Sequence, residues 1–392
     1  MTSKTESNTS KPDVQYNTIK APLYPTPEQK ELFQKTFDCC RYIWNKMLED
    51  HERFYYEADA HFIPTPAKYK KQAPFLKEVD NQALIQEYNK LSQAFRNFFR
   101  NPKAFGYPKF KRKKNDRDTF TACNHVMGNS STIYLTKDAV RMTKAGLIRT
   151  KLPRRPRSGW RLTRVTVERT KTGKYYGYLL FACPVRQPEP VKPTADTTIG
   201  LKYSVSHFYE TDHGLTADPP HWLRQSQEKA SAIQKKLSRL QKGSKNYENL
   251  VQKYRLLHEH IANQRRDFAH KESRRIANAW DAVCIRDDSL KAISEELGGS
   301  SVRDTGFGMF REMLRYKLER QGKQLLEVNR FEPTTKVCSV CGAVNEKLSP
   351  RTRRWVCPVC GTEHQRGKNA ALNIKARGLA DYQKKQAAPS AS

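Results

Sequence analysis

Two Cys-x-x-Cys pairs near the C-terminal end constrain the local fold of this chain more than any other feature. The pairs are CSVC at 338–341 and CPVC at 357–360, separated by residues 342–356, a spacing typical of paired zinc knuckles. Four thiolates satisfy a tetrahedral Zn²⁺ ion and leave no position for water, so we predict a structural site. Glycines follow both pairs, as in knuckle turns, which favours zinc over a disulfide or redox pair. The predicted ligands are Cys338, Cys341, Cys357 and Cys360.

The charge of the chain indicates the kind of partner. Its 392 residues contain 72 lysines and arginines against 40 acidic residues, and the formal net charge is +32. The basic residues are spread along the chain, so it attracts polyanions and binds them in a salt-dependent way. Nucleic acid is the favoured partner, with other polyanions or a membrane surface as alternatives. With 37% hydrophobic residues the chain is large enough for two or three folded units.

The sequence favours a cytoplasmic, nucleoid-associated protein. We find no apolar run of about 18 residues, as a membrane span needs, and the polar start lacks the apolar core of a signal peptide. The remaining cysteines lie in apolar surroundings, which is typical of reduced core residues. They are Cys39, Cys40, Cys123, Cys183 and Cys284.

Two helices are predicted in the first half of the chain. Thr26 is suited to cap the first, with Pro27 at its first position and Gln29 completing a capping box. The second covers "NQALIQEYNKLSQAFRNFFR", where Gln82 and Gln86 lie one turn apart on one face. Such a pair is either a solvated surface or a reader of adenine edges in a major groove.

A basic and aromatic segment, "FGYPKFKRKK", follows these helices. Aromatic faces stack on bases while ammonium and guanidinium groups contact phosphate, so the composition predicts a nucleic-acid groove. A solvated run of charges is the alternative. The predicted contact residues are Tyr107, Lys109, Lys111 and Arg112.

Strands and helices then alternate. "RLTRVTVERT" and "YYGYLLFACPV" have the period of antiparallel strands, and the proline-rich "RQPEPVKPTAD" is typical of a linker. Beyond it, "TTIGLKY" and "AVCIRDD" are strand-like, residues 224–280 predict a helical hairpin, and "KNAALNIKARGLA" predicts a closing helix. This order indicates an α/β layer.

The order of these motifs resembles that of the TnpB family, transposon-encoded RNA-guided nucleases ancestral to type V CRISPR effectors. The resemblance covers residues 17–380 and includes "YPTPEQKELFQKTFDCCRYIWN", "GYPKFKRK", "IGLK", "HKESRRIA" and "CPVCGTEHQRGKNAALNI". It implies an α/β multidomain fold, with an N-terminal wedge-like β-barrel that carries a helical recognition insertion. A C-terminal RNase H-like (RuvC) domain with an inserted four-cysteine zinc ribbon would follow.

The resemblance also implies a division of the chain. Residues 1–15 form a disordered N-terminus and 16–190 the wedge β-barrel with its recognition unit, helical at about 27–105. Residues 191–333 form the RuvC-like domain with its helical hairpin. The rest divides into the zinc ribbon at 334–363, the closing helix at 364–380 and a disordered tail at 381–392.

Three positions depart from the catalytic motifs of the family. Aligning "IGLK" with "GIDLGLK" puts Thr198 at the first aspartate, "IEDL" puts Arg286 at the glutamate, and "HDRDxNAA" puts Gly367 at the last aspartate. Two-metal phosphodiester hydrolysis needs carboxylates around two Mg²⁺ ions about 4 Å apart. We therefore predict a protein that is not an enzyme and binds no catalytic Mg²⁺. Of the nearby acids, Asp196 lies about 6–7 Å along the strand from Thr198 and Asp287 points to the opposite face from Arg286, so neither is well placed. Glu363 is the remaining candidate for a rebuilt metal site.

A chain with these three departures resembles the nuclease-dead TnpB-like repressors. The implied function is RNA-guided binding of double-stranded target DNA beside a short duplex motif, so that occupancy of the target represses transcription. The alternatives are an active TnpB-like endonuclease with relocated acidic residues and a zinc-ribbon RNA chaperone. The implied partners are a guide RNA and target DNA, with no membrane; the oligomeric state stays open. The implied motif readers are Asn81, Gln82, Gln86, Thr121 and Asn124.

Overall fold

The computed structural model divides the chain into two compact units, residues 1–186 and 187–392, each of which is described by itself. The described ranges are 14–59, 61–113, 117–127, 130–184, 188–204, 207–217, 221–288, 306–349 and 352–387, and the side chains of 221–224 are not described. The expected disordered N-terminus lies outside these ranges except for residues 14 and 15, which belong to a strand.

The first unit is built on a seven-stranded antiparallel sheet in the order β2-β8-β9-β1-β7-β6-β5. Within the described residues the hydrogen-bonded order begins at β2 and ends at β5, and the wedge-like β-barrel stays a prediction. A separate two-stranded ribbon is formed by β3 and β4. The strands are β1 (Val14–Tyr24), β2 (Asp118–Cys123), β3 (Val126–Met127), β4 (Ser130–Ser131), β5 (Tyr134–Leu135), β6 (Ala139–Met142), β7 (Gly146–Thr150), β8 (Arg161–Arg169) and β9 (Tyr175–Pro184).

Two long helices lie between β1 and β2 in the chain, α1 (Pro27–Ala58) and α2 (Asn81–Arg100), with 3₁₀ turns at Pro66–Lys70 and Pro74–Lys77. The predicted capping box is confirmed, because the Thr26 hydroxyl accepts from the Gln29 amide while the Gln29 side chain accepts from the Thr26 amide. Phe33 and Phe37 of α1 pack on Phe120 of β2 with ring centres 5.4 and 5.5 Å apart. These contacts fix the helices to the sheet.

The second unit is built on a five-stranded sheet in the order β12-β11-β10-β13-β14. The strands β10, β13 and β14 are parallel, whereas β11 and β12 are antiparallel to their neighbours. Parallel strands need a crossover, which the intervening helices supply. The strands are β10 (Thr198–Tyr203), β11 (Tyr209–Thr211), β12 (Thr216–Ala217), β13 (Ala282–Arg286) and β14 (Gln324–Val328).

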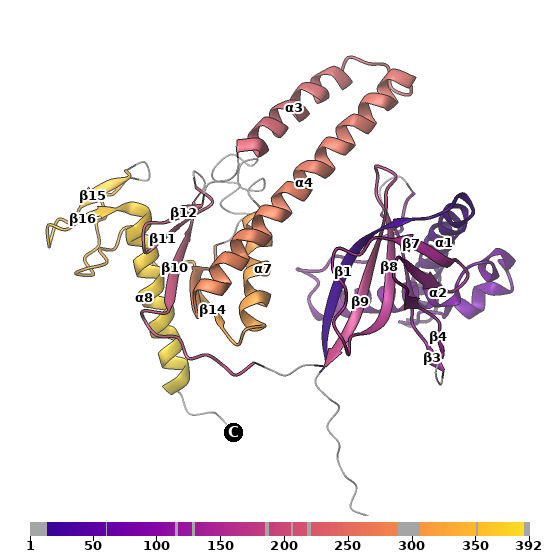
Figure 1. Ribbon diagram of the computed structural model, residues 1–392, viewed down its shortest axis with the longest axis horizontal. Helices are drawn as coiled ribbons and strands as arrows, with labels where there is room; N and C mark the ends of the chain where they lie inside the picture. The colour runs from indigo at the N-terminus through magenta and orange to yellow at the C-terminus, as the bar shows by residue number, and fades with distance from the viewer. Residues whose placement is uncertain are drawn as a thin grey trace, which may run out of the picture. The chain divides into compact units, whose positions relative to one another are not determined.

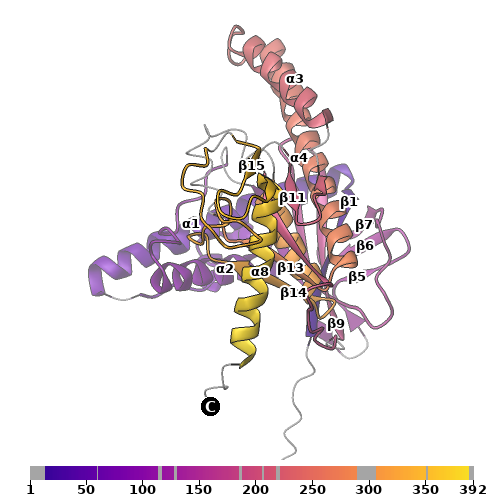
Figure 2. The same cartoon turned by 90° about the vertical axis from the view of Figure 1, so that its left-hand side faces the viewer.

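Helices cover both faces of this sheet. The predicted hairpin is present as α3 (His221–Leu237) and α4 (Lys245–Ala279), and α7 (Phe307–Glu319) packs beside α4 (Figure 1). The last helix, α8 (Arg366–Ala387), contacts β10, β13 and β14 (Figure 2). A Cβ atom at Gly200 would collide with the carbonyl oxygen of Ala371, so α8 lies directly on the backbone of β10.

Between β14 and α8 the chain forms a small hairpin of β15 (Arg354–Val356) and β16 (Glu363–Gln365). The predicted tail is wrong in part, because residues 381–387 continue α8 to Ala387. Among the residues that the structure describes, none of the helices combines the length and apolar character that crossing a bilayer requires.

Candidate metal centre and nucleic-acid interface

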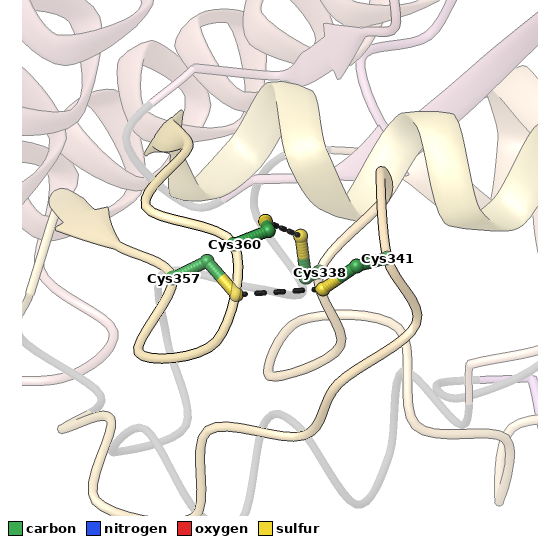
Figure 3. Close-up of side chains that lie close together, drawn as sticks. All are labelled: Cys338, Cys341, Cys357 and Cys360. Carbon is green, nitrogen blue, oxygen red and sulfur yellow. Dashed lines mark hydrogen bonds between the residues drawn. The ribbon is translucent and has the colours of Figure 1, made fainter.

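The four predicted ligands come together in the second unit. The Sγ atoms of Cys338 and Cys360 are 3.6 Å apart, as are those of Cys341 and Cys357, and all four lie within 4.8 Å of one another (Figure 3). Two ligands of a tetrahedral zinc ion with Zn–S bonds of about 2.3 Å are separated by about 3.8 Å. The geometry therefore fits a closed metal site with four cysteine ligands.

Equivalent turns build both halves of this cluster. The amide of Gly342 donates to the Cys338 carbonyl oxygen and that of Gly361 to the Cys357 carbonyl oxygen, each at 3.0 Å. Gly342 and Gly361 have φ of 75° and 72°, a left-handed conformation that favours glycine. Each turn brings the two thiols of its pair to the same side.

Polar groups around the sulfur atoms favour thiolates. The Nε2 atom of His364 lies 3.0 Å from the Cys338 Sγ atom, and the Thr362 hydroxyl lies 3.2 Å from the Cys360 Sγ atom. Hydrogen bonds from the Thr362 side chain and backbone lower the pKa of Cys360 to about 6. The pKa of Cys341 is instead about 12, because the backbone hydrogen bond of Ala343, which lowers it, is outweighed by the side chains of Cys360 and the other two cysteines. The support for a thiolate is therefore clearest at Cys360. Since metals bind the deprotonated thiol, these contacts support metal binding.

The cluster is fixed to α8 by two asparagines. The buried Asn369 side chain accepts from the Ser339 amide at 2.9 Å and donates to the Val337 carbonyl oxygen at 2.7 Å. One turn later, Asn373 donates to the carbonyl oxygens of Thr334 and Val337, each at 2.8 Å. The two cysteine turns and the helix are therefore one connected element.

The N-terminus of α8 meets the carboxyl ends of two parallel strands. Lys202 of β10 lies opposite Glu210 of β11, and the parallel register places Arg286 of β13 beside Lys202. A Cβ atom at Gly367 would overlap the Glu210 carboxylate, so that carboxylate fills the space next to the helix. Lys202 and Gly200 share a face of β10, the face that α8 covers.

Thr198 does not join this group. It is the first residue of β10 and is four residues from Lys202, about 13 Å along a strand at about 3.3 Å per residue. Its buried hydroxyl donates to the Thr194 carbonyl oxygen at 2.6 Å. The β10 residue that lies near Arg286 and Gly367 is therefore Lys202.

Four basic side chains, here termed the cationic cluster, surround this point: Lys202, Arg286, Arg353 and Arg366. Burial lowers the pKa of Lys202, and the Glu210 carboxylate opposes that effect. The guanidinium groups of Arg366, Arg286 and Arg353 lower the pKa further. Basic side chains arranged in this way attract phosphate. A divalent cation prefers oxygen ligands, and the carboxylates beside this cluster are Glu210 and Asp288.

None of the three acids considered as substitutes lies in this arrangement. Asp287 pairs with Arg311 at 3.0 Å, while the Arg286 side chain is held by Asp288 at 2.6 Å. Asp196 is exposed in the turn before β10, and Glu363 is exposed on β16. Glu210 and Asp288 are the acids that the sequence did not single out, because strand pairing and a local ion pair bring them here.

The structure gives different surroundings to the five predicted motif readers. Asn81 is exposed and Gln86 half-buried, and Gln82, whose amide donates to the Asp80 cap, is half-buried as well. Thr121 is buried, and its hydroxyl is 2.9 Å from that of Thr166.

Asn124 is occupied within the first unit. Its side chain donates to the Leu162 carbonyl oxygen and accepts from Ser131, Thr132 and Ile133. The Asn124 side chain and the buried Thr121 are therefore held by contacts within the first unit, and their roles as motif readers stay predictions.

The predicted contact residues of the basic segment also differ in their exposure. Tyr107 and Lys109 are exposed, and Arg112 is exposed as well. Lys111 instead turns inward, where its Nζ atom meets the buried carboxylate of Glu87 at 2.5 Å. Lys111 shares this carboxylate with Lys90, so its ammonium group is held within the first unit, and its nucleic-acid contact stays a prediction.

Three family models match the chain. One, described as a helix-turn-helix domain, matches residues 16–59; one described as "Probable transposase" matches 181–292; and a "Cas12f1-like, TNB domain" matches 307–374. A "Putative RNA-guided DNA endonuclease" of Streptomyces pristinaespiralis is 30% identical over 376 residues, which cover 92% of this chain and 89% of the relative. The chain belongs to the TnpB family.

Other TnpB relatives agree with this assignment. The "Putative RNA-guided DNA endonuclease InsQ" of Escherichia coli (strain K12) is 27% identical over 387 residues and covers 92% of each chain. The fold also resembles that in a Cas12f1–sgRNA–target DNA complex, with a TM-score of 0.59, 12% identity, and coverage of 92% of this chain and 99% of that one.

These relatives overturn one prediction. Two TnpB relatives that span nearly the whole chain carry the name "Putative RNA-guided DNA endonuclease", and this contradicts the expectation that the chain is not an enzyme. That expectation rested on three aligned positions, one of which, Thr198, the structure places at the far end of its strand from the other two.

Proposed function

We propose that this chain is an RNA-guided DNA-binding protein that occupies a guide-matched target beside a short duplex motif and thereby blocks transcription of that target. The observation that carries the proposal is the full-length similarity to a relative named as an RNA-guided DNA endonuclease. The fold shared with a solved complex of guide RNA and target DNA supports it. Base pairing with the guide reads the sequence, while the protein holds the heteroduplex through its backbone.

The second unit supplies a site for that backbone. The cationic cluster of Lys202, Arg286, Arg353 and Arg366 lies at the carboxyl ends of β10 and β13. Guanidinium and ammonium groups bind phosphate oxygens in charge-assisted hydrogen bonds. The zinc knuckles position the N-terminal turn of α8, which carries Arg366.

DNA cleavage is the second candidate function, and the names of the TnpB relatives favour it. In this chain Glu210 and Asp288 are the carboxylates beside the cationic cluster. Glu210 would have to act directly opposite Lys202.

One experiment tests both functions. RNA that co-purifies with the protein is sequenced, and a duplex that matches its 3′ segment is compared with a scrambled duplex, with binding and strand breaks measured in the same Mg²⁺-containing reaction. Guide-dependent binding supports the proposal, and equal affinity for both duplexes refutes it. Strand breaks that Glu210→Gln abolishes would establish cleavage, with the exposed Glu363→Gln as the matched control.

A further inference from the structure

A pocket of about 480 Å³ opens in the helical layer of the first unit. It lies between the C-terminal part of α1, the segment 61–63 and the C-terminal half of α2. This volume is within the range of small-ligand sites. The lining residues are His51, His61, Ile63, Tyr88, Asn89, Ser92, Phe95, Arg96 and Phe99, none of which is acidic.

Flat rings form the walls of this pocket in layers. His51 stacks on Phe95 with ring centres 3.9 Å apart and planes inclined by 27°. His61 stacks on Tyr55 at 5.0 Å and meets Phe99 edge-on at 4.8 Å. His61 and Phe99 are both exposed, so a further planar group can stack on the same walls.

Polar groups accompany the rings. Asn89, Ser92 and Arg96 follow one another at spacings of three and four on α2 and so lie on one face of the helix. His51 is 2% exposed, and its Nδ1 atom is buried without a hydrogen-bond partner among the described residues. Buried polar atoms without a partner in the protein are commonly satisfied by an ordered water, an ion or a ligand.

The state of His51 suits such a partner. Burial lowers the pKa of His51 below its ordinary value, and the neighbouring His61 lowers it further. The ring is therefore neutral near pH 7, and its Nδ1 atom either donates or accepts one hydrogen bond. The amide of Asn89 offers both a donor and an acceptor.

We propose that this pocket binds one unstacked nucleobase of a single-stranded nucleic acid. A base combines two planar faces with an edge of donors and acceptors, which matches the stacked rings and the Asn89 and His51 groups. The phosphates on either side are attracted by Arg96 and by the net charge of +32. The identity of the strand, guide RNA or displaced target DNA, rests on the proposed function.

The test uses the full-length protein and 12-nucleotide single strands, one of RNA and one of DNA, each with a single 2-aminopurine. Wild type should quench the fluorescence of the base on binding. Phe99→Ala and Asn89→Ala should each raise Kd roughly tenfold and abolish the quenching, because stacking and the base-edge contact are lost. Phe62→Ala is the matched control, since Phe62 is 56% exposed and does not line the pocket.

The outcomes separate this inference from the proposed function. If the two variants lose affinity tenfold for the RNA strand alone, the pocket binds the guide. If they lose it for the DNA strand alone, the pocket binds the displaced strand. If Phe99→Ala and Phe62→Ala give the same Kd and the same quenching, the pocket does not bind a base, even where guide-dependent duplex binding persists. If the wild type does not distinguish matched from scrambled duplex but quenches 2-aminopurine, the proposed function fails and the pocket stands.

Discussion

Lys111→Met is expected to destabilise the first unit by about 3 kcal/mol. The Glu87 side chain is 1% exposed and meets Lys90 at 2.6 Å and Lys111 at 2.5 Å. Removing one partner of a buried ion pair costs about 3–5 kcal/mol, and we assign roughly half of that here because Lys90 remains. The Lys111 ammonium also lies 3.9 Å from the centre of the Trp44 ring, a contact that adds about 1 kcal/mol.

The measurement is the free energy of unfolding in urea, followed by hydrogen exchange of peptides from α2 so that the first unit is observed separately. Lys109→Met is the matched control, because Lys109 is exposed and the hydrogen bond from the Trp44 indole nitrogen goes to its backbone carbonyl oxygen, which the substitution keeps. The double variant Glu87→Gln with Lys111→Met should recover part of the loss, since no charge is then left buried. A difference below about 0.5 kcal/mol between Lys111→Met and Lys109→Met would refute the reasoning.

Four further outcomes are expected. Metal analysis in reducing buffer should give one zinc per chain and none in Cys357→Ser, because three thiolates hold zinc poorly; a wild type without zinc would contradict the site. Replacing Lys109 and Arg112 by alanine should lower the slope of log K against log salt by up to about two units, and an unchanged slope would mean that neither contacts phosphate. Gly200→Ala should lower the free energy of unfolding by about 2 kcal/mol in thermal melts, since its Cβ meets the backbone of α8; wild-type stability would show that the helix can shift. Burial lowers the pKa of Lys317 to about 8 from 10.5, so the unfolded state binds more protons between these values and unfolding free energy should rise from pH 8 to pH 10.5; Lys317→Met should remove that rise, and an identical pH profile would contradict it.

Features set by neighbours in the chain could be predicted from the sequence. The turn after each Cys-x-x-Cys pair needs a glycine, and it places the two thiols of that pair near each other. This holds for Cys338 and Cys341 and equally for the second pair. The capping box at Thr26 is equally local, because its bonds span three residues. The structure bears out the clustering of the thiols and the start of α1 for this reason.

Features set by contacts across the fold could not be predicted in this way. The sequence motif around Gly200 does not determine which end of β10 lies at the N-terminus of α8. In the structure Gly367 of α8 lies against Glu210, and Glu210 pairs with Lys202, so Lys202 is the β10 residue at that end. In the sequence Lys111 is one of several consecutive basic residues, but in the structure its side chain points to the buried Glu87. Neither signal is visible in residue type or spacing.

The asparagine contacts between the two cysteine turns and α8 have a consequence for protein engineering. A chimera that exchanges these turns between relatives at residue 363 would separate Asn369 and Asn373 from the loop that they hold. The smallest transplantable module is therefore residues 334–387, which brings the whole helix with it. Because α8 also lies on Gly200, the corresponding strand of the recipient protein must carry glycine at that position so that the transplanted helix can pack against it.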